Sequence, residues 1–119
     1  MQRPSERLTI SKISFIAEQD GVSERDLKNE LKRLFSVRIE VDRAYLARVH
    51  YGNPAEWQVS LCLAGNPTES LLSEIQNIFN KMFLSGNQLD LLVLNVNQES
   101  QIRKIVKPFY NASIAKTRQ

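Results

Sequence analysis

The architecture follows from one segment, Asp42-Arg43-Ala44-Tyr45-Leu46-Ala47-Arg48-Val49-His50-Tyr51 (residues 42–51). Along it, Tyr45, Ala47, Val49 and Tyr51 alternate with Ala44, Leu46, Arg48 and His50, as side chains do on the two faces of a β-strand. The turn-forming residues Gly52-Asn53-Pro54 follow, and a second alternating segment runs from Trp57 to Gly65. Two such segments joined by a short turn predict an antiparallel β-hairpin.

Upstream of the hairpin, the sequence predicts one strand and one helix. Residues 8–16 are rich in β-branched and aromatic side chains and alternate imperfectly, which favours a strand. Four apolar residues then recur at helical spacing within residues 24–35. Ser23 and Asp26 stand three residues apart before this pattern, so we expect Ser23 to cap the helix.

Downstream of the hairpin, a longer helix and a strand are predicted. Asn66 is placed to cap the helix, Pro67 suits its first turn, and Gly86 suits the residue that ends it. Residues 89–96 are almost continuously apolar, which is typical of a strand that is covered by other elements. Asn97 then predicts the start of a short helix, which ends at Pro108.

The predicted order is therefore β-α-β-β-α-β followed by α. This is an α+β fold with a roughly four-stranded, mostly antiparallel sheet and helices packed on it. The order is compatible with a ferredoxin-like arrangement, in which two helices cover one face of the sheet. Strand order itself cannot be read from one sequence.

The size and composition of the chain fit one domain. At 119 residues with 42% hydrophobic side chains, one packed core is expected. We predict a single domain over residues 1–119, with flexible ends at 1–7 and 111–119. Residues 1–7 show no apolar leader, and no stretch approaches the roughly 20 apolar residues of a membrane span. The expected location is the cytoplasm, away from membranes.

The charge distribution keeps nucleic acid in view as an alternative partner. The formal net charge is only +3, but from residue 101 onward there are basic residues and no acidic one. This basic end could bind RNA or DNA, but a solvated tail is the simpler explanation of it. Tyr45, Tyr51 and Trp57 are the candidate stacking platform, yet they lack the glycine and aromatic pattern of RNA-recognition domains.

The reactive side chains do not form a recognisable catalytic or metal-binding motif. His50 has no carboxylate or cysteine at a motif spacing, so we interpret it as a surface histidine. Asp42 and Asp90 each begin a strand, where aspartate commonly serves a turn. Cys62 is the one cysteine and lies in an apolar strand, as a buried thiol would. We therefore predict no enzyme activity, no cofactor and no metal.

The chain closes with a proline and two aromatic residues, in the segment Lys107-Pro108-Phe109-Tyr110. Because the proline ends the helix, the two rings can either pack on the sheet near Tyr45 or anchor a partner. Both uses are compatible if Phe109 is buried while Tyr110 and Lys107 stay at the rim. Tyr45, Lys107, Phe109 and Tyr110 are the predicted partner-binding residues.

These segments resemble the C-terminal domain of the bacterial enhanced serine sensitivity protein B (SseB) family. The similarity spans roughly residues 10 to 110 and is carried by Val41-Asp42-Arg43-Ala44-Tyr45-Leu46-Ala47, by the strand Leu89 to Leu94 and by Lys107-Pro108-Phe109-Tyr110. Because the family is known by a serine-sensitivity phenotype and has no established reaction, the resemblance implies an accessory or regulatory role in the bacterial cell.

We therefore predict a non-catalytic protein-interaction or regulatory module with an unidentified protein partner. Nucleic-acid binding through the basic C-terminal end is the alternative. An exposed edge strand could in addition pair two copies into a homodimer.

Overall fold

The computed structural model describes residues 13–52, 57–83 and 89–117, and in them the chain is an α+β fold with a mixed sheet, as predicted. The elements follow the order β1 (Ile13–Glu18), α2 (Val22–Ser36), β2 (Val41–Tyr51), β3 (Gln58–Gly65), α3 (Glu69–Phe83), β4 (Asp90–Val93), α4 (Val96–Ile102), β5 (Tyr110–Asn111) and α5 (Ala112–Thr117). Residues 8–12 and Gly86, for which the sequence predicts strand and helix end, lie outside the described residues.

The predicted hairpin is confirmed and forms the centre of the sheet. Strands run in the order β1-β2-β3-β4, and β5 pairs with β2 beyond the end of β1. β1 and β3 are both antiparallel to β2, while β4 is parallel to β3. In the hairpin register Tyr45 lies opposite Cys62 and Leu46 opposite Leu61.

The ferredoxin-like arrangement is wrong. In that fold, the two strands that flank a helix run parallel to each other with another strand between them, and both helices cover one face. Here α2 returns the chain antiparallel to β1 and directly beside it. A helix of this length can connect either kind of strand pair, so the order of elements in the sequence does not distinguish the two topologies.

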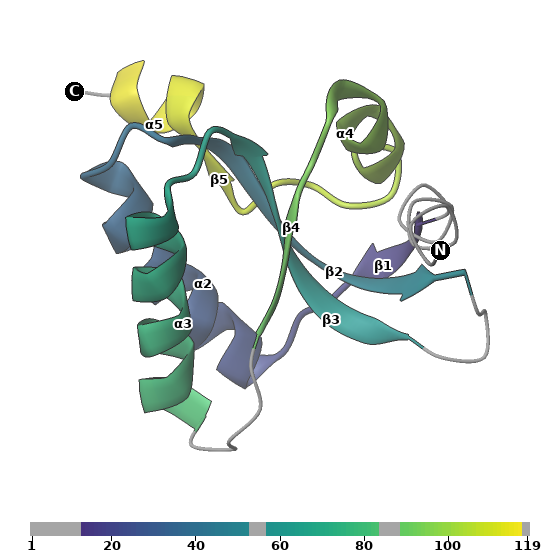
Figure 1. Cartoon of the computed structure of the whole chain (residues 1–119), viewed down its shortest axis with the longest axis horizontal. Coiled ribbons are helices and arrows are strands. Elements are labelled where there is room, and N and C mark those ends of the chain that lie inside the picture. The colour runs from purple at the N-terminus through teal and green to yellow at the C-terminus, as the bar shows by residue number, and fades with distance from the viewer. Residues whose placement is uncertain (1–12, 53–56, 84–88, 118–119) are drawn as a thin grey trace, which may run out of the picture.

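Helices cover both faces of the sheet (Figure 1). Residues of α2 and α3 pack on one face against Ala44 and Leu46 of β2, and Tyr110 closes this core. Tyr45, Ala47 and Val49 point to the other face, where they pack against residues of α4 and the segment after it. The alternation of β2 thus places it between two apolar layers, which is why residues 44–47 and Val49 are buried.

All three predicted helix starts are displaced from the residues predicted to cap them. Helix α2 begins after Gly21 with no side-chain cap, so Ser23 lies inside the helix. Helix α3 begins at Glu69, and the Thr68 hydroxyl accepts a hydrogen bond from the backbone N–H of Leu71 at 3.2 Å. Thr68 therefore takes the role predicted for Asn66. Several polar residues precede each helix, and tertiary packing selects among them.

The end of the chain also differs from the expectation. Asn95 caps α4 through reciprocal hydrogen bonds with Gln98, in place of Asn97. The helix ends at Ile102, well before Pro108. Residues 111–117, predicted to belong to a flexible end, include part of β5 and all of α5. Tyr110 pairs with Ala44 of β2, which draws this last segment onto the sheet.

Candidate functional site

The two closing aromatic residues pack on the core beside α2. The backbone N–H of Phe109 donates to the carbonyl of Ala44 at 2.9 Å. Tyr110 is 4% exposed, and its hydroxyl donates to the carbonyl of Phe35 at 3.2 Å. The ring centroids of Phe35 and Tyr110 lie 5.4 Å apart. Tyr110 is thus buried where a rim position was expected, and Phe109 is half-buried.

Tyr45 lies on the opposite face of the sheet and is fully buried. Its hydroxyl donates to Glu99 of α4 at 2.6 Å, and Arg43 binds the same carboxylate with two nitrogens, Nη2 at 2.9 Å. These hydrogen bonds from Arg43 lower the pKa of Glu99, and burial raises the pKa of the Tyr45 hydroxyl. The cluster joins α4 to β2 across the sheet face.

The four predicted partner-binding residues consequently do not form one surface. Tyr45 and Tyr110 are buried in different cores, and only Lys107 is well exposed. The predicted platform of Tyr45, Tyr51 and Trp57 is divided as well, because Tyr51 packs with Tyr45 while Trp57 contacts Arg48 of the other face. For Lys107 and Phe109, contact with a partner stays a prediction. For Tyr45 and Tyr110, burial argues against direct contact with a partner.

The side chains considered for catalysis are dispersed. His50 is half-buried, and its Nδ1 has no hydrogen-bond partner among the described residues. Asp42 is exposed, and Asp90 accepts a hydrogen bond from the Tyr51 hydroxyl. In the described ranges no three His, Cys, Asp or Glu residues are grouped to hold a metal ion. The absence of enzyme activity stays a prediction.

An apolar hollow of about 350 Å³ lies where the start of α2 and the end of α3 meet the sheet. The rings of Phe79 and Phe83 stack along one wall, with centroids 4.8 Å apart. Both rings are only half-buried, so they line the hollow without being covered by described residues. The residues that line it are Glu24, Leu27, Leu46, Gln58, Val59, Phe79, Phe83, Leu89 and Asp90.

A chain of side chains leads from this hollow to an exposed tryptophan. Gln19 donates to Glu24 at 2.8 Å, and Arg48 donates through Nε to Gln19 at 2.8 Å. The guanidinium of Arg48 lies 5.0 Å from the centroid of the Trp57 ring, which is 54% exposed. We call the hollow together with Gln19, Arg48 and Trp57 the Trp57 site.

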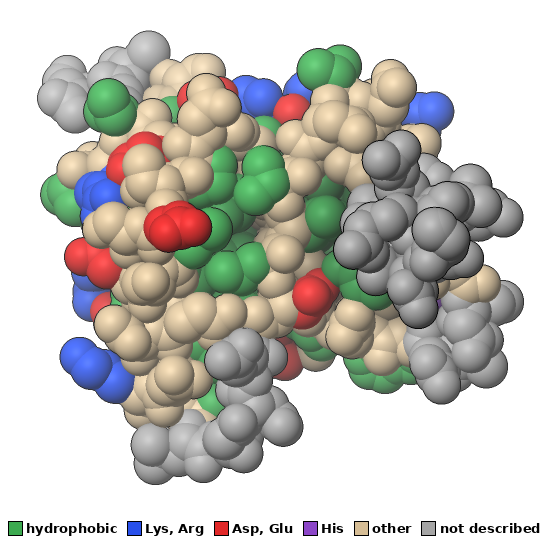
Figure 2. Space-filling view, viewed as in Figure 1, with side chains coloured by type: hydrophobic (Ala, Val, Ile, Leu, Met, Phe, Trp, Pro, Cys, Tyr) green, Lys and Arg blue, Asp and Glu red, His purple; other side chains and the backbone are tan. Residues whose placement is uncertain are grey.

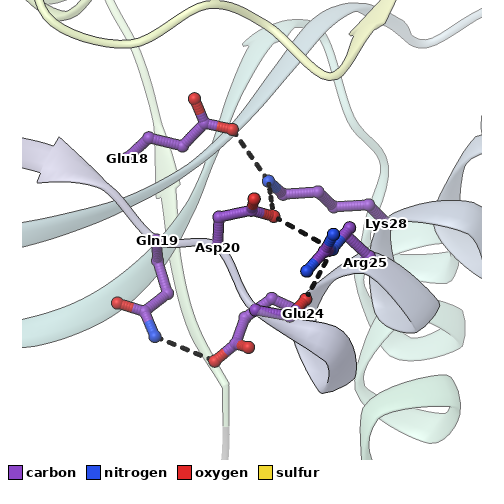
Figure 3. A network of polar contacts seen from close by, with 7 residues as sticks. Glu18, Gln19, Asp20, Glu24, Arg25 and Lys28 are labelled. Carbon is purple, nitrogen blue, oxygen red and sulfur yellow. Dashed lines mark hydrogen bonds and ion pairs between the residues drawn. The ribbon is translucent and has the colours of Figure 1, made fainter.

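A second polar network holds the β1–α2 turn that carries Gln19 and Glu24 (Figure 3). The Lys28 ammonium, whose side chain is 8% exposed, lies 2.9 Å from Glu18 and 3.3 Å from Asp20. Its hydrogen bond to Asp20 lowers the pKa of that carboxyl. A cation buried this deeply is expected to need both carboxylates, so the turn has one preferred conformation.

Among the described residues, the Trp57 site therefore combines an apolar hollow with the exposed cation of Arg48. Glu18 and Asp20 pair with Lys28, and Glu24 accepts from Gln19. Arg48 forms no ion pair with any described residue, although it is exposed. Its terminal nitrogens can bind a carboxylate, and the adjacent hollow can bury an apolar side chain.

Sequence reasoning identified Trp57 only as part of a stacking platform and missed Arg48, Phe79 and Phe83 as site residues. One signal was present: Arg48 and Trp57 both lie next to the hairpin turn, so antiparallel pairing brings them close together. For Phe79 and Phe83 no signal separated them from the core, because they continue the apolar stripe of α3.

Comparison with protein families gives one match. The family model described as the SseB protein C-terminal domain matches residues 18–111, which include every element from α2 to β5 and the Trp57 site. Comparison with the curated proteins and with the solved structures gives no match. No helix in the described ranges is long and apolar enough to cross a membrane.

Proposed function

The chain belongs to the family of SseB protein C-terminal domains, and from this premise we propose that it is a non-catalytic protein-interaction module. Its partner presents a segment with a large apolar side chain next to a carboxylate. The apolar side chain enters the hollow of the Trp57 site, and the carboxylate pairs with Arg48. The accessory role that the family resemblance implies is consistent with such a module.

The apolar hollow supports this proposal by its size and lining. Burying a leucine-sized or phenylalanine-sized side chain contributes roughly 1.5–3 kcal/mol. The half-buried rings of Phe79 and Phe83 supply the apolar surface for this contact. Aromatic side chains are enriched at the centres of protein interfaces, where they carry a large share of the binding energy.

The Arg48–Trp57 pair is the single observation on which the proposal depends. Arginine and tryptophan are the residue types most often found at interface hot spots. The ring supports the flat guanidinium, and the hydrogen bond to Gln19 fixes its Nε. The terminal nitrogens keep the fork geometry that matches a carboxylate. This arrangement selects an acidic segment over a basic one.

Selection from a display library of random 12-residue peptides tests the proposal. We expect the selected peptides to share an apolar residue beside Asp or Glu, and to lose at least about tenfold in affinity with the Arg48→Glu variant. Lys32→Glu is the matched control, because Lys32 is exposed on the solvent side of α2 and the charge change is the same. Peptides without acidic residues, or equal loss in both variants, would contradict the proposal.

A second assay tests the alternative function, nucleic-acid binding. This alternative is supported by the exposed basic side chains of Arg103, Lys104 and Lys107. Retention of a labelled random RNA pool that falls steeply with salt, and falls further in Lys104→Glu, would favour that function. The proposed peptide binding instead depends on Arg48 and is indifferent to Lys104.

A further inference from the structure

Gln19 lies between two charged side chains of the Trp57 site and binds both. Its amide oxygen accepts from the Nε of Arg48 at 2.8 Å, and its amide nitrogen donates to the carboxylate of Glu24 at 2.8 Å. Its backbone N–H donates to the carbonyl of Leu46 at 3.0 Å, which ties the residue to β2. One neutral amide therefore separates the guanidinium from a carboxylate that lines the hollow.

The two charged neighbours fix the orientation of the Gln19 amide. A guanidinium can only donate hydrogen bonds, and an ionised carboxylate can only accept them. If the amide were turned end for end, its NH₂ group would face the Nε–H of Arg48 and its oxygen would face the Glu24 carboxylate. Both hydrogen bonds would then be lost. The amide therefore bridges the two charged groups in one orientation only.

The residues on either side of Gln19 are held by a different cation. Glu18 and Asp20 both pair with the Lys28 ammonium, at 2.9 Å and 3.3 Å. In the close view of this turn, the Gln19 side chain extends toward Glu24 and away from Lys28 (Figure 3). The contacts of Lys28 thus hold the backbone of the turn and leave the Gln19 amide to bridge Arg48 and Glu24.

The amide binds Arg48 without neutralising its charge. It accepts from Nε, so the two terminal nitrogens can still bind a carboxylate of a partner. On the face of the molecule seen in Figure 2, hydrophobic side chains gather between α3 and β4, and Lys and Arg side chains lie at the margins. An apolar surface does not by itself distinguish an acidic segment from a neutral one. The charge of Arg48 therefore decides whether the Trp57 site selects a carboxylate.

We propose that Gln19 is the positioning and specificity-determining residue of the Trp57 site. It holds the guanidinium of Arg48 at the Trp57 ring and keeps it from pairing directly with Glu24. A direct pair would cancel the charge and draw the flexible arginine side chain away from the ring. This inference rests on the proposed function for the nature of the partner, whereas the position of Arg48 is a property of the protein alone.

The protein without any partner tests the positioning of Arg48. The Nε–H of Arg48 and the indole N–H of Trp57 are followed by NMR in wild type and in Gln19→Ala. We expect both resonances to shift in Gln19→Ala, because the guanidinium loses its acceptor and leaves the ring. Gln101→Ala is the matched control, since Gln101 is exposed on α4 at the opposite sheet face. Unchanged resonances in a folded Gln19→Ala protein would overturn the proposal.

The charge of the side chain at position 19 tests the specificity, even if Gln19→Ala does not fold. Gln19→Glu keeps the shape of the side chain and its acceptor, but it gives Arg48 an internal carboxylate. Its affinity for an acidic peptide selected from the library should fall at least about tenfold. Gln101→Glu makes the same chemical change at a distance and should keep the affinity within about twofold. Wild-type affinity in Gln19→Glu would contradict the proposal.

A rescue experiment tests the direct pairing of Arg48 with Glu24. Gln19→Ala should weaken binding of the acidic peptide, and adding Glu24→Gln should restore most of the affinity, because Arg48 then has no carboxylate beside it. An affinity that stays equally low in the double variant would exclude the proposed role of Gln19. A wild-type protein that selects no acidic peptide would instead contradict the proposed function, and the NMR comparison would still decide whether Gln19 positions Arg48.

Discussion

Arg48 and Trp57 meet across the β2–β3 hairpin, with the guanidinium 5.0 Å from the ring centroid. Arg48 lies opposite Val59 in the ladder, so the hairpin register brings it within reach of Trp57 just before β3. The same guanidinium donates to Gln19, which in turn holds Glu24 at the hollow. The hairpin that organises the fold therefore also positions the proposed binding site.

The first prediction concerns two glycines with positive φ. A Cβ at Gly65 (φ 135) would lie 2.4 Å from the carbonyl oxygen of Glu40, whereas a Cβ at Gly52 (φ 101) would meet nothing within 4 Å. Gly52→Ala should cost about 1 kcal/mol of unfolding free energy from backbone strain alone. Gly65→Ala should cost about 3 kcal/mol, because a steric clash adds to the strain. Urea unfolding measures both, and equal losses would contradict the geometry.

The second prediction concerns Glu99, whose pKa is lowered by hydrogen bonds from Arg43. The unfolded chain then binds this proton at a higher pH than the folded protein does. The stabilisation is complete above the unfolded pKa of about 4.3 and is lost as pH falls through the lower folded value. Glu99→Gln should therefore cost about 2 kcal/mol at pH 7, and its difference from wild type should shrink below pH 4.

The control for Glu99 is Glu30→Gln, which removes an exposed pair with Arg33 on α2. Exposed pairs contribute little, so this variant should change the free energy of unfolding by less than about 0.5 kcal/mol at every pH. A Glu99→Gln effect that is independent of pH would show that the carboxylate charge is not what stabilises α4 on the sheet.

The third prediction concerns the thiol of Cys62. Burial raises its pKa to about 12, and the residue is fully buried between the hairpin and α4. We expect the native protein to react with a thiol reagent at pH 8 only as fast as it unfolds. The unfolded chain in urea should react at the rate of a free cysteine. Rapid labelling of the folded protein would place the thiol at the surface.

The fourth prediction separates the closing residues. Tyr110→Phe removes the hydrogen bond to the Phe35 carbonyl and keeps the ring. This change should lower the free energy of unfolding by about 1 kcal/mol, since a buried acceptor loses its donor. Lys107→Ala, at an exposed position, should leave stability unchanged within about 0.5 kcal/mol. The opposite ranking in urea unfolding would mean that Tyr110 does not close the core.

The sequence predicts elements better than it predicts their arrangement. The hairpin, the long helix and the strand within residues 89–96 are readable because alternation, helical spacing and continuous apolar runs arise within each segment, as in residues 42–51. The parallel pairing of β4 with β3, and the covering of the second sheet face by α4, depend on contacts between distant segments. No pattern in the chain specifies those contacts.

The same holds for the candidate site: features within one segment could be predicted, whereas contacts between distant segments could not. The closing aromatics were identified as a pair next to β2, and Phe109 does bind Ala44 of that strand. Packing of these rings on the sheet was one of the two predicted uses, but the deeper burial of Tyr110 than of Phe109 could not be foreseen, because it depends on Phe35 of α2. Similarly, the pairing of Lys28 with Glu18 and Asp20 could not be read from the sequence, because it depends on how the β1–α2 turn folds back on the helix.

The fluorescence emission of Trp57 tests most directly the claim that a partner segment binds at the Trp57 site. Trp57 is the only tryptophan in the chain, so the emission reports on this site alone. A selected peptide with an apolar residue beside a carboxylate is titrated into the protein while its affinity is followed independently by calorimetry. We predict a saturable change in emission with the same dissociation constant, weakened by salt and by Arg48→Glu. Calorimetric binding without any change in Trp57 emission, or with full affinity in Arg48→Glu, would contradict the account.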